Sequence, residues 1–336
     1  MAFRPVVVLL ESRKCASKSR RQIYGRYTSL ARLIFAGTPD TALPLLEAVA
    51  ALEDHEIVGV LTRPDAPRGR SKKLRPSQIA KRAEELSIPV YKPATPKDEA
   101  AHQLLDSLHA DLAVVVAYGQ IIPPPALAQL PKGWINVHYS LLPKWRGAAP
   151  VERAIEAGER ETGVSIFQIE EGLDTGPIWD KQEVPISPST DTPQLFEALN
   201  VKAAQMIGHV LAKIADGNEA PLPQEGTSSY AKMFNKAAQQ VDWQRPAEEV
   251  SAKIRAFTPG AWSTHQGTRM KIASPTITAK TLPAGAIQAT KKQLFVGTGT
   301  EALEIGQVAP AGKSWMSGAA WARGAHLDAS SKMEEK

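Results

Sequence analysis

Cysteine is almost absent from this sequence. Cys15 is the only one in 336 residues, so no disulfide can form within the chain, and a reducing compartment fits this composition. Long apolar runs are also missing, since the longest fall well short of the ~20 residues that a membrane helix requires. With 43% hydrophobic and 22% charged residues, the chain nevertheless has the composition of an ordinary globular protein. We therefore expect a folded protein without membrane contact.

Two common signatures of ligand sites are also lacking. No G-x-G-x-x-G fingerprint follows the first predicted strand, where Gly37-Thr38-Pro39 stands instead, so a nicotinamide dinucleotide site is poorly supported. None of the seven histidines falls into a cluster with cysteine or acidic residues at ligand spacing, so we expect no metal. His102 and His109, two turns apart on one predicted helix, are interpreted as ordinary surface or core residues.

The length favours two domains, and the pattern changes along the chain accordingly. The pattern predicts strands at 33–36, 57–61, 88–91, 111–117, 135–138 and 164–169, alternating with helices at 41–52, 77–86, 98–108, 149–157 and 192–216. A helix at 247–257 is followed, beyond Pro259-Gly260, by short β segments that indicate a small barrel. We predict an α/β fold with a Rossmann-like, doubly wound parallel sheet in 31–217, a linker in 218–240 and a small β-barrel in 241–336.

Residues 1–30 show no pattern that fits a packed element. Their apolar run, Pro5 to Leu10, is shorter than a signal-peptide core, and most of the basic residues come after it. The segment is rich in arginine and serine and poor in acidic residues, as transit peptides are. We interpret it as a disordered extension or the product of an upstream start codon, with an organelle address as the alternative.

The stretch from Trp134 to Gly147 reads W-I-N-V-H-Y-S-L-L-P-K-W-R-G and carries the strongest functional signal. Asn136 and His138 are two positions apart, so a strand presents both on the same face, at the carboxyl edge where open α/β sheets hold their ligands. An isolated N-x-H is more often a buried pair that bonds to the backbone. A second signal is Asp174, which lies between Gly172 and Gly176, where the glycines permit close approach to a ligand.

Together these stretches resemble the active-site signature of the 10-formyltetrahydrofolate-dependent formyltransferase family. Asn136, His138 and the loop Ser140-Leu141-Leu142-Pro143 match it residue by residue, and Gly172-Leu173-Asp174-Thr175-Gly176 is similar to the family's aspartate loop. The resemblance covers roughly residues 31 to 336. Phe35-Ala36-Gly37-Thr38-Pro39 and the basic loop after Arg63 are similar to the branch that acts on methionyl-tRNA.

The resemblance implies a function and a cellular setting. The expected reaction transfers the formyl group of 10-formyltetrahydrofolate, a co-substrate, to the α-amino group of initiator methionyl-tRNA for translation initiation. A cytoplasmic, bacterial-type enzyme that works as a monomer is expected. The C-terminal barrel would be OB-like and would bind the tRNA.

The same resemblance assigns roles to individual residues. Acyl transfer to an amine creates an oxyanion, for which the Asn136 amide and a protonated His138 are suitable donors. Asp174 could accept the amine proton, orient His138 or support its charge, and the sequence does not decide between these roles. The folate is expected against the loop formed by Ser140, Leu141, Leu142 and Pro143 and against the backbone of Tyr118 and Gly119.

The distribution of charge points to a polyanionic partner. Residues 32–220 carry 25 acidic and 19 basic side chains, whereas residues 221–336 carry nine acidic and fourteen basic ones. Within the acidic part, Arg63 to Arg75 has six basic residues and one acid, and neither a helical nor a strand period. We expect an exposed, mobile loop that binds phosphate through Arg70, Lys72 and Lys73, Arg70 being the family's loop arginine. A merely solvated basic surface is the alternative.

Three other functions share part of these features. A sister formyltransferase that acts on a small amine would keep Asn136, His138 and Asp174 but would not need the basic loop. A hydrolase that deformylates the folate could use the same three residues. A non-catalytic RNA-binding module would have no need for all three.

Overall fold

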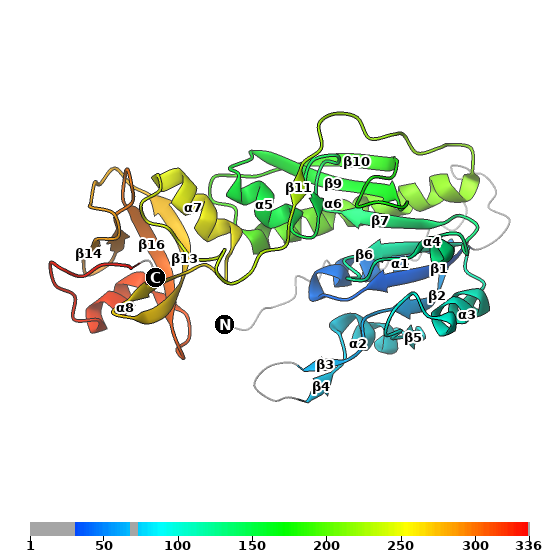
Figure 1. The fold of residues 1–336 in the computed structure, drawn as a ribbon, viewed down its shortest axis with the longest axis horizontal. Helices are drawn as coiled ribbons and strands as arrows, with labels where there is room; N and C mark the ends of the chain where they lie inside the picture. The colour runs from blue at the N-terminus through cyan, green and yellow to red at the C-terminus, as the bar shows by residue number, and fades with distance from the viewer. Residues whose placement is uncertain (1–30, 68–72, 335–336) are drawn as a thin grey trace, which may run out of the picture. The chain divides into compact units, whose positions relative to one another are not determined.

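The computed structural model describes residues 31–67 and 73–334 (Figure 1). The prediction for residues 1–30 lies outside this part of the chain, as do Arg70 and Lys72 of the basic loop. The described residues form two main β-sheets, one parallel for the most part and one antiparallel. This confirms the predicted α/β class with a smaller β structure at the C-terminal end.

The first sheet has seven strands. In spatial order they are β10 (Ile178–Pro185), β9 (Glu161–Gln168), β7 (Trp134–His138), β6 (Leu112–Val116), β1 (Ala31–Gly37), β2 (His55–Leu61) and β5 (Val90–Tyr91). Every pair from β7 to β5 is parallel, as predicted, whereas β9 runs antiparallel to both β7 and β10. The edge strand β10 is half polar and exposed, and the sequence analysis did not anticipate it.

Helices connect these strands and cover the sheet. They are η2 (Asp40–Ala42, a 3-10 helix), α1 (Leu43–Ala50), α2 (Gln78–Glu85), α3 (Glu99–Leu108), α4 (Pro124–Leu127), α5 (Pro150–Glu156) and α6 (Thr192–Asp216). Helix α6 has the predicted bounds because both ends are marked in the sequence. Asp191 and Gln194 form a capping box at its start, and Gly217 ends it with a φ of 67°.

The central strand β6 shows why this sheet is covered on both faces. Leu112, Val114 and Val116 belong to the apolar cluster that contains α1 and α6, whereas Ala113 and Val115 belong to the cluster that contains α3 and α4. Successive side chains of a strand point to opposite faces, so an unbroken apolar run is what a doubly covered strand requires. The prediction for this strand is confirmed.

The basic segment after β2 contains more regular structure than expected. Two short strands, β3 (Ala66–Pro67) and β4 (Leu74–Arg75), form an antiparallel pair, which Figure 1 shows beside α2. The prediction that no strand occurs here is therefore wrong for these four residues, although they are exposed as expected. The sequence gives no strand signal here because two residues are too few to show an alternating pattern. Lys92 on the chain after β5 contacts Asp65 at 2.7 Å and fixes the base of this pair.

The segment predicted as a linker is held to the first sheet by backbone bonds. Leu222 exchanges two backbone hydrogen bonds with Ile178, of 2.7 and 2.9 Å. Further on, β11 (Tyr230–Ala231) pairs in parallel with β8 (Arg146–Gly147), which lies in the loop after β7. The segment thus runs beside the stretch that carries the functional signal.

The second sheet curls into a small barrel-like structure. Its strands, in spatial order, are β12 (Trp262–His265), β13 (Thr268–Ile277), β16 (Leu303–Pro310), β15 (Leu294–Val296) and β14 (Ile287–Ala289), with β17 (Met316–Ser317) paired to β16. Residues near the end of the chain bridge the two edges, since Glu334 pairs with Thr264 of the edge strand β12 and Lys332 pairs with Ala286, which directly precedes the edge strand β14. Helix α8 (Gly318–Gly324) contacts β15, β16 and β17. The predicted small β-barrel is confirmed.

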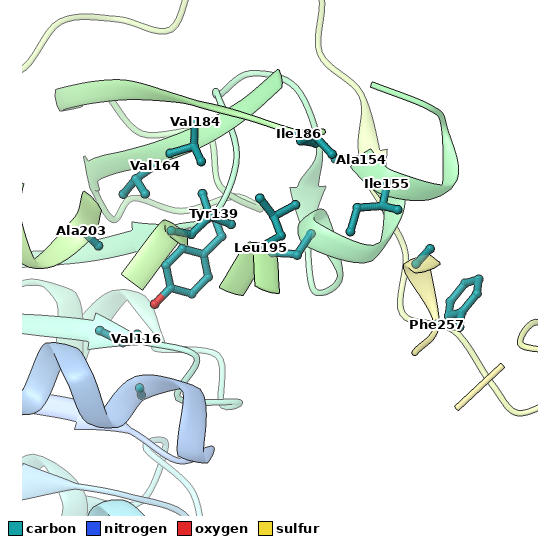
Figure 2. Packing of buried hydrophobic residues seen from close by; sticks show 14 of the residues in the cluster. Val116, Tyr139, Ala154, Ile155, Val164, Val184, Ile186, Leu195, Ala203 and Phe257 are labelled. Atoms are coloured by element: carbon teal, nitrogen blue, oxygen red, sulfur yellow. The ribbon is translucent and has the colours of Figure 1, made fainter. Parts of the chain in front are cut away.

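Helix α7 (Ala247–Ala256) connects the second sheet to the first. It packs against α5, and Lys253 forms an ion pair of 2.7 Å with Glu156 of that helix. The Thr192 hydroxyl at the start of α6 donates a hydrogen bond of 2.6 Å to the carbonyl of Ala256. Figure 2 shows part of the apolar cluster that continues from the first sheet to Phe257.

Candidate active site

Asn136 and His138 lie on the face of β7 opposite to α6. Ile135 and Val137 point into the apolar cluster of α6, and Trp134 belongs to the cluster on the other face. By strand alternation, Asn136 and His138 share the face of Trp134, as predicted. His138 is the last residue of β7, so its imidazole is presented at the carboxyl edge of the parallel strands.

The surroundings of the two side chains differ. His138 is 5% exposed and lies edge-on to the ring of Phe167 on β9, whereas Asn136 is half-buried. Within the described residues, the Asn136 carboxamide makes no hydrogen bond to another residue. Its N–H groups are therefore available to a ligand, which a satisfied structural asparagine would not offer.

The hydrogen bonds of His138 fix its tautomer. Nε2 lies 3.0 Å from the carbonyl oxygen of Trp145, and a carbonyl can only accept, so Nε2 carries the proton. Nδ1 then holds a lone pair when the ring is neutral, and it lies 3.9 Å from Oδ2 of Asp174. The imidazole therefore presents a proton-accepting nitrogen on the side of the carboxylate.

Burial lowers the pKa of His138 below its ordinary value, and this effect outweighs the opposing influences of Asp174 and of the Trp145 carbonyl. The ring is consequently neutral at physiological pH. The protonated donor considered from the sequence is not the resting form of this side chain. The sequence could not reveal this, because the shift depends on how deeply the loop after β7 covers the ring.

The loop that carries Asp174 begins near the start of β7, at the opposite end of the strand from His138. Strand β9 is antiparallel to β7 and ends at Gln168, opposite Ile135 near the start of β7, so the following loop must fold back along the sheet. A Cβ at Gly176 would collide with the carbonyl oxygen of Gln168, which explains the glycine there. Asp174 itself has a φ of 52°, a conformation that aspartate tolerates better than most residues. These turns bring its carboxylate to the end of β7.

The backbone of Gly147 holds the Asp174 carboxylate. Its N–H donates a hydrogen bond of 2.7 Å to Oδ2, the same oxygen that faces His138. Gly147 has a φ of 117°, and a Cβ there would lie 2.9 Å from the carbonyl oxygen of Ala231 on β11. Only glycine fits this position, because the backbone must turn and β11 passes close by.

Two residues of the predicted linker complete the surroundings of the site. Gln224 donates hydrogen bonds of 2.8 Å to the carbonyls of both Asp174 and Gly176 and accepts hydrogen bonds from the guanidinium of Arg146. The Ser229 hydroxyl accepts a hydrogen bond of 2.9 Å from the N–H of Trp145. Sequence reasoning missed both, since a glutamine and a serine in a polar, proline-containing segment give no signal of their own.

The loop from Ser140 to Pro143 is turned largely inward. The side chains of Ser140 and Leu142 are 0% exposed, that of Pro143 is buried and that of Leu141 is half-buried. The Ser140 hydroxyl donates to the carbonyl of Lys144 at 2.6 Å, inside the loop. Because these exposures include the backbone, and the backbone of both residues is already hydrogen-bonded to Ser165, Ser140 and Leu142 present no surface to a ligand here, whereas the half-buried Leu141 does.

Tyr118 and Gly119 follow β6, the strand next to β7, and leave the sheet at the same edge. The side chain of Tyr118 is 2% exposed, and burial raises its pKa to about 12. Gly119 is exposed and has a φ of 80°. Ile121, two residues on, is 83% exposed, so this loop presents backbone and an apolar side chain rather than the tyrosine ring.

The remaining predicted site residues are only partly within the described chain. Arg70 and Lys72 lie outside it, and Lys73 directly precedes β4. Arg63, at the start of the basic segment, lies close to Gly119, since a Cβ on that glycine would be 3.3 Å from the arginine Cδ. Among residues 31–67 and 73–334, no three His, Cys, Asp or Glu side chains gather as metal ligands. Nor does any helix of this part of the chain combine the length and apolar character of a membrane span.

Comparison with known proteins gives matches along nearly the whole chain. The family model described as formyl transferase matches residues 31–211, and the model described as formyl transferase, C-terminal domain, matches residues 233–326. A methionyl-tRNA formyltransferase of Cutibacterium acnes is 45% identical over 315 residues, which cover 90% of this chain and 99% of that protein.

Solved structures with the same fold are more distant in sequence. HypX from Aquifex aeolicus, in complex with tetrahydrofolic acid, has a TM-score of 0.63 at 17% identity, over 88% of this chain and 47% of that chain. An N-formyltransferase from Helicobacter canadensis, in complex with folinic acid and dTDP-3-aminofucose, has a TM-score of 0.61 at 19% identity, over 82% of this chain and 99% of its own.

Proposed function

This chain belongs to the formyl transferase family, and we propose that it transfers the formyl group of 10-formyltetrahydrofolate to the α-amino group of initiator methionyl-tRNA for translation initiation. The resemblance seen in Asn136-Val137-His138 and in the Asp174 loop is thereby confirmed at the level of the family. The observation that carries the proposal is the extent of the match to a methionyl-tRNA formyltransferase, 45% identity over 99% of that protein's length.

The first step of the proposed reaction is attack of the substrate amine on the formyl carbon. A new C–N bond forms, and the formyl oxygen takes on negative charge. The Asn136 carboxamide, which is half-buried and whose N–H groups have no partner in the described part of the chain, stabilises this oxyanion. It acts without rearrangement because β7 is paired on both sides, with β6 and with β9.

His138 takes up the proton that the attacking nitrogen loses. Its Nδ1 has a lone pair in the resting tautomer, and its lowered pKa keeps it unprotonated at neutral pH. The nearby Asp174 carboxylate, at 3.9 Å, then stabilises the imidazolium. When the bond between the formyl carbon and N10 breaks, His138 gives the same proton to N10, and tetrahydrofolate is the product. Proton and electron pair are thus both accounted for without a metal.

The folate is proposed to lie between two loops. One is the loop of Tyr118 and Gly119, in which Gly119 is exposed, and the other is the loop of Asp174. Ile121 and Leu173 are 83% and 58% exposed, and they offer apolar surface to the flat rings of the folate. The loop from Ser140 to Pro143 closes the site from the side of β7, and its half-buried Leu141 is the residue that presents surface there.

The tRNA is proposed to contact the basic segment and the second sheet. In this assignment residues 31–217 are the catalytic domain, 218–240 the linker and 241–336 the OB-like tRNA-binding domain. Arg70, Lys72 and Lys73 neutralise phosphates or read a groove near the acceptor end. An enzyme for a small amine would not need this basic surface, which favours the tRNA over the alternatives. We propose that the protein is a cytoplasmic monomer.

A direct assay tests the proposal. The protein is mixed with 10-formyltetrahydrofolate and methionyl initiator tRNA, and formyl-methionine is measured after hydrolysis of the ester. An amino-sugar nucleotide replaces the tRNA in one control, and release of formate without an acceptor is followed in another. Formylation of the amino sugar, or hydrolysis alone, would contradict the proposal. Arg70→Ala is expected to weaken kcat/KM for the tRNA by about 1–3 kcal/mol and to leave folate affinity unchanged.

A further inference from the structure

We infer that Gln224, in the segment between the two halves of the chain, is a positioning residue of the active site that holds Asp174 against His138. Gln224 lies outside both matched family segments, 31–211 and 233–326. Its side chain nevertheless contacts the two loops on either side of the reacting groups. The inference rests on the proposed function, because it assigns Asp174 an effect on His138.

Every polar atom of the Gln224 side chain takes part in this contact. The amide nitrogen donates two hydrogen bonds of 2.8 Å, to the carbonyls of Asp174 and Gly176. The amide oxygen accepts from Nη2 of Arg146 at 2.6 Å and from Nε at 3.2 Å. A glutamine has two N–H donors and one carbonyl acceptor, so this geometry uses its whole capacity.

These bonds lie where the aspartate loop needs support. Asp174 has a φ of 52°, and its loop has folded back from the far end of β9, so few regular backbone bonds hold it. Gln224 binds the backbone of Asp174 itself, while Gly147 binds its carboxylate. Arg146 and Gly147 together form β8. The glutamine therefore links the aspartate loop to the same strand whose Gly147 N–H binds the Asp174 carboxylate.

Asp174 is the charged group that acts on the imidazole in this arrangement. On the loop after β7, Lys144 points to Glu159 at 3.6 Å, and Arg146 is bound by Gln224. On β9, the residues opposite Asn136 and His138 are Phe167 and Ser165, which carry no charge. Loss of Gln224 would release the aspartate loop and would also free Arg146 to pair with Asp174. Both changes weaken the support that the carboxylate gives to a protonated His138.

A double-mutant cycle tests this role. Gln224→Met keeps the length of the side chain and removes all four hydrogen bonds, and we expect kcat to fall on the order of 10- to 100-fold, as for a small displacement of a reacting group. The KM for 10-formyltetrahydrofolate should change little. In the Asp174→Ala background, Gln224→Met should have almost no further effect on kcat, because the carboxylate that it positions is gone.

A second variant separates positioning from loss of fold. Gln224→Glu keeps an acceptor for Arg146 but places a carboxylate oxygen where two carbonyls need a donor, so it should slow the reaction as Gln224→Met does. Thr227→Glu, three residues away and exposed, adds the same charge and should have no effect. Melting temperatures of all variants show whether they are folded under the assay conditions.

NMR signals of the His138 imidazole give a readout that needs no substrate. Gln224→Met should shift them in the same direction as Asp174→Ala does. Effects on kcat that add in the double mutant, or an unchanged His138 signal in folded Gln224→Met, would overturn the inference. If Asp174→Ala alone leaves kcat unchanged, the proposed mechanism fails instead. If the wild-type protein forms no formyl-methionine, the function fails, and the NMR comparison still decides the role of Gln224.

Discussion

The loop after β7 and the segment from Leu222 to Ala231 meet at the same site but contribute different things to it. The first continues from Asn136, whose carboxamide can stabilise a negative charge, and from His138, whose imidazole can transfer a proton. The second contributes no group with a pKa near neutrality to the site. It contributes a glutamine amide, a serine hydroxyl and the backbone of β11, all used in hydrogen bonds to the loops that carry the reacting groups.

The first region therefore supplies the groups that react, and the second supplies hydrogen bonds that position them. Proton transfer at neutral pH can be performed by few residue types, so a histidine and an aspartate in a recognisable spacing are informative. Hydrogen bonds that position a loop can come from almost any polar side chain or from the backbone. We therefore expect substitutions in the first region to change the rate of the reaction strongly, and those in the second to act through stability or placement.

His138→Ala should give the largest effect. It removes the proton acceptor on β7, and we expect kcat/KM for the tRNA to fall by about 10²- to 10⁴-fold, the usual contribution of a general base. Steady-state formylation kinetics measure this. The matched control is His102→Ala on α3, whose imidazole bonds to Gln129 at 2.7 Å and takes no part in the site. Near wild-type turnover in His138→Ala would refute the mechanism.

Asp174→Asn should have a smaller effect with a characteristic dependence on pH. The neutral His138 is the active form, so kcat/KM falls as the pH drops through its pKa, which burial places below the ordinary value. Asp174 raises that pKa, so its removal should move the acidic limb to still lower pH. The plateau of kcat/KM above that pKa should fall roughly 10- to 100-fold. A limb that moves to higher pH would show that Asp174 does not act on His138.

The parts of the fold that could be predicted are those with a long or repeated pattern. Helix α6 and the buried strand β6 were identified because capping residues mark the one and an unbroken apolar run marks the other. The strand β10 was missed because half of its residues are polar and only one is buried, so it shows no clear apolar pattern. The pairs β3–β4 and β8–β11 were missed because strands of two residues are too short to show a periodic pattern.

The candidate site divides in the same way. Asn136, His138 and Asp174 were singled out from residue type and spacing, and the structure brings His138 and Asp174 together. The protonation state of His138 was not predictable, since it depends on burial and on the carbonyl of Trp145, whose own N–H is held by Ser229, 84 positions further along the chain. Gln224 was invisible for the same reason, because its four hydrogen bonds exist only after the loops have folded.

Ser229→Ala should show the effect of the second region on stability. The substitution leaves the N–H of Trp145 without the acceptor that lies 2.9 Å away. We expect the free energy of unfolding to fall by about 0.5–1.5 kcal/mol, the net contribution of one hydrogen bond, as measured by urea denaturation. Ser228→Ala is the control, because Ser228 is exposed and immediately adjacent. Equal effects of the two substitutions would mean that the hydroxyl of Ser229 holds nothing in place.

Leu222→Ala should have the smallest effect, although this leucine lies at the start of the same segment. Its backbone exchanges two hydrogen bonds with Ile178, but its side chain is 72% exposed. If the segment acts through its backbone and a few polar atoms, loss of this side chain should change stability by less than about 0.5 kcal/mol and leave kcat unchanged. Leu222→Pro is the informative counterpart, because proline removes the N–H that donates to Ile178 at 2.9 Å. It should destabilise the protein by about 1 kcal/mol or more. A clear loss of activity in Leu222→Ala would show that the exposed leucine contacts a substrate, and the distinction between the two regions would then fail at this position.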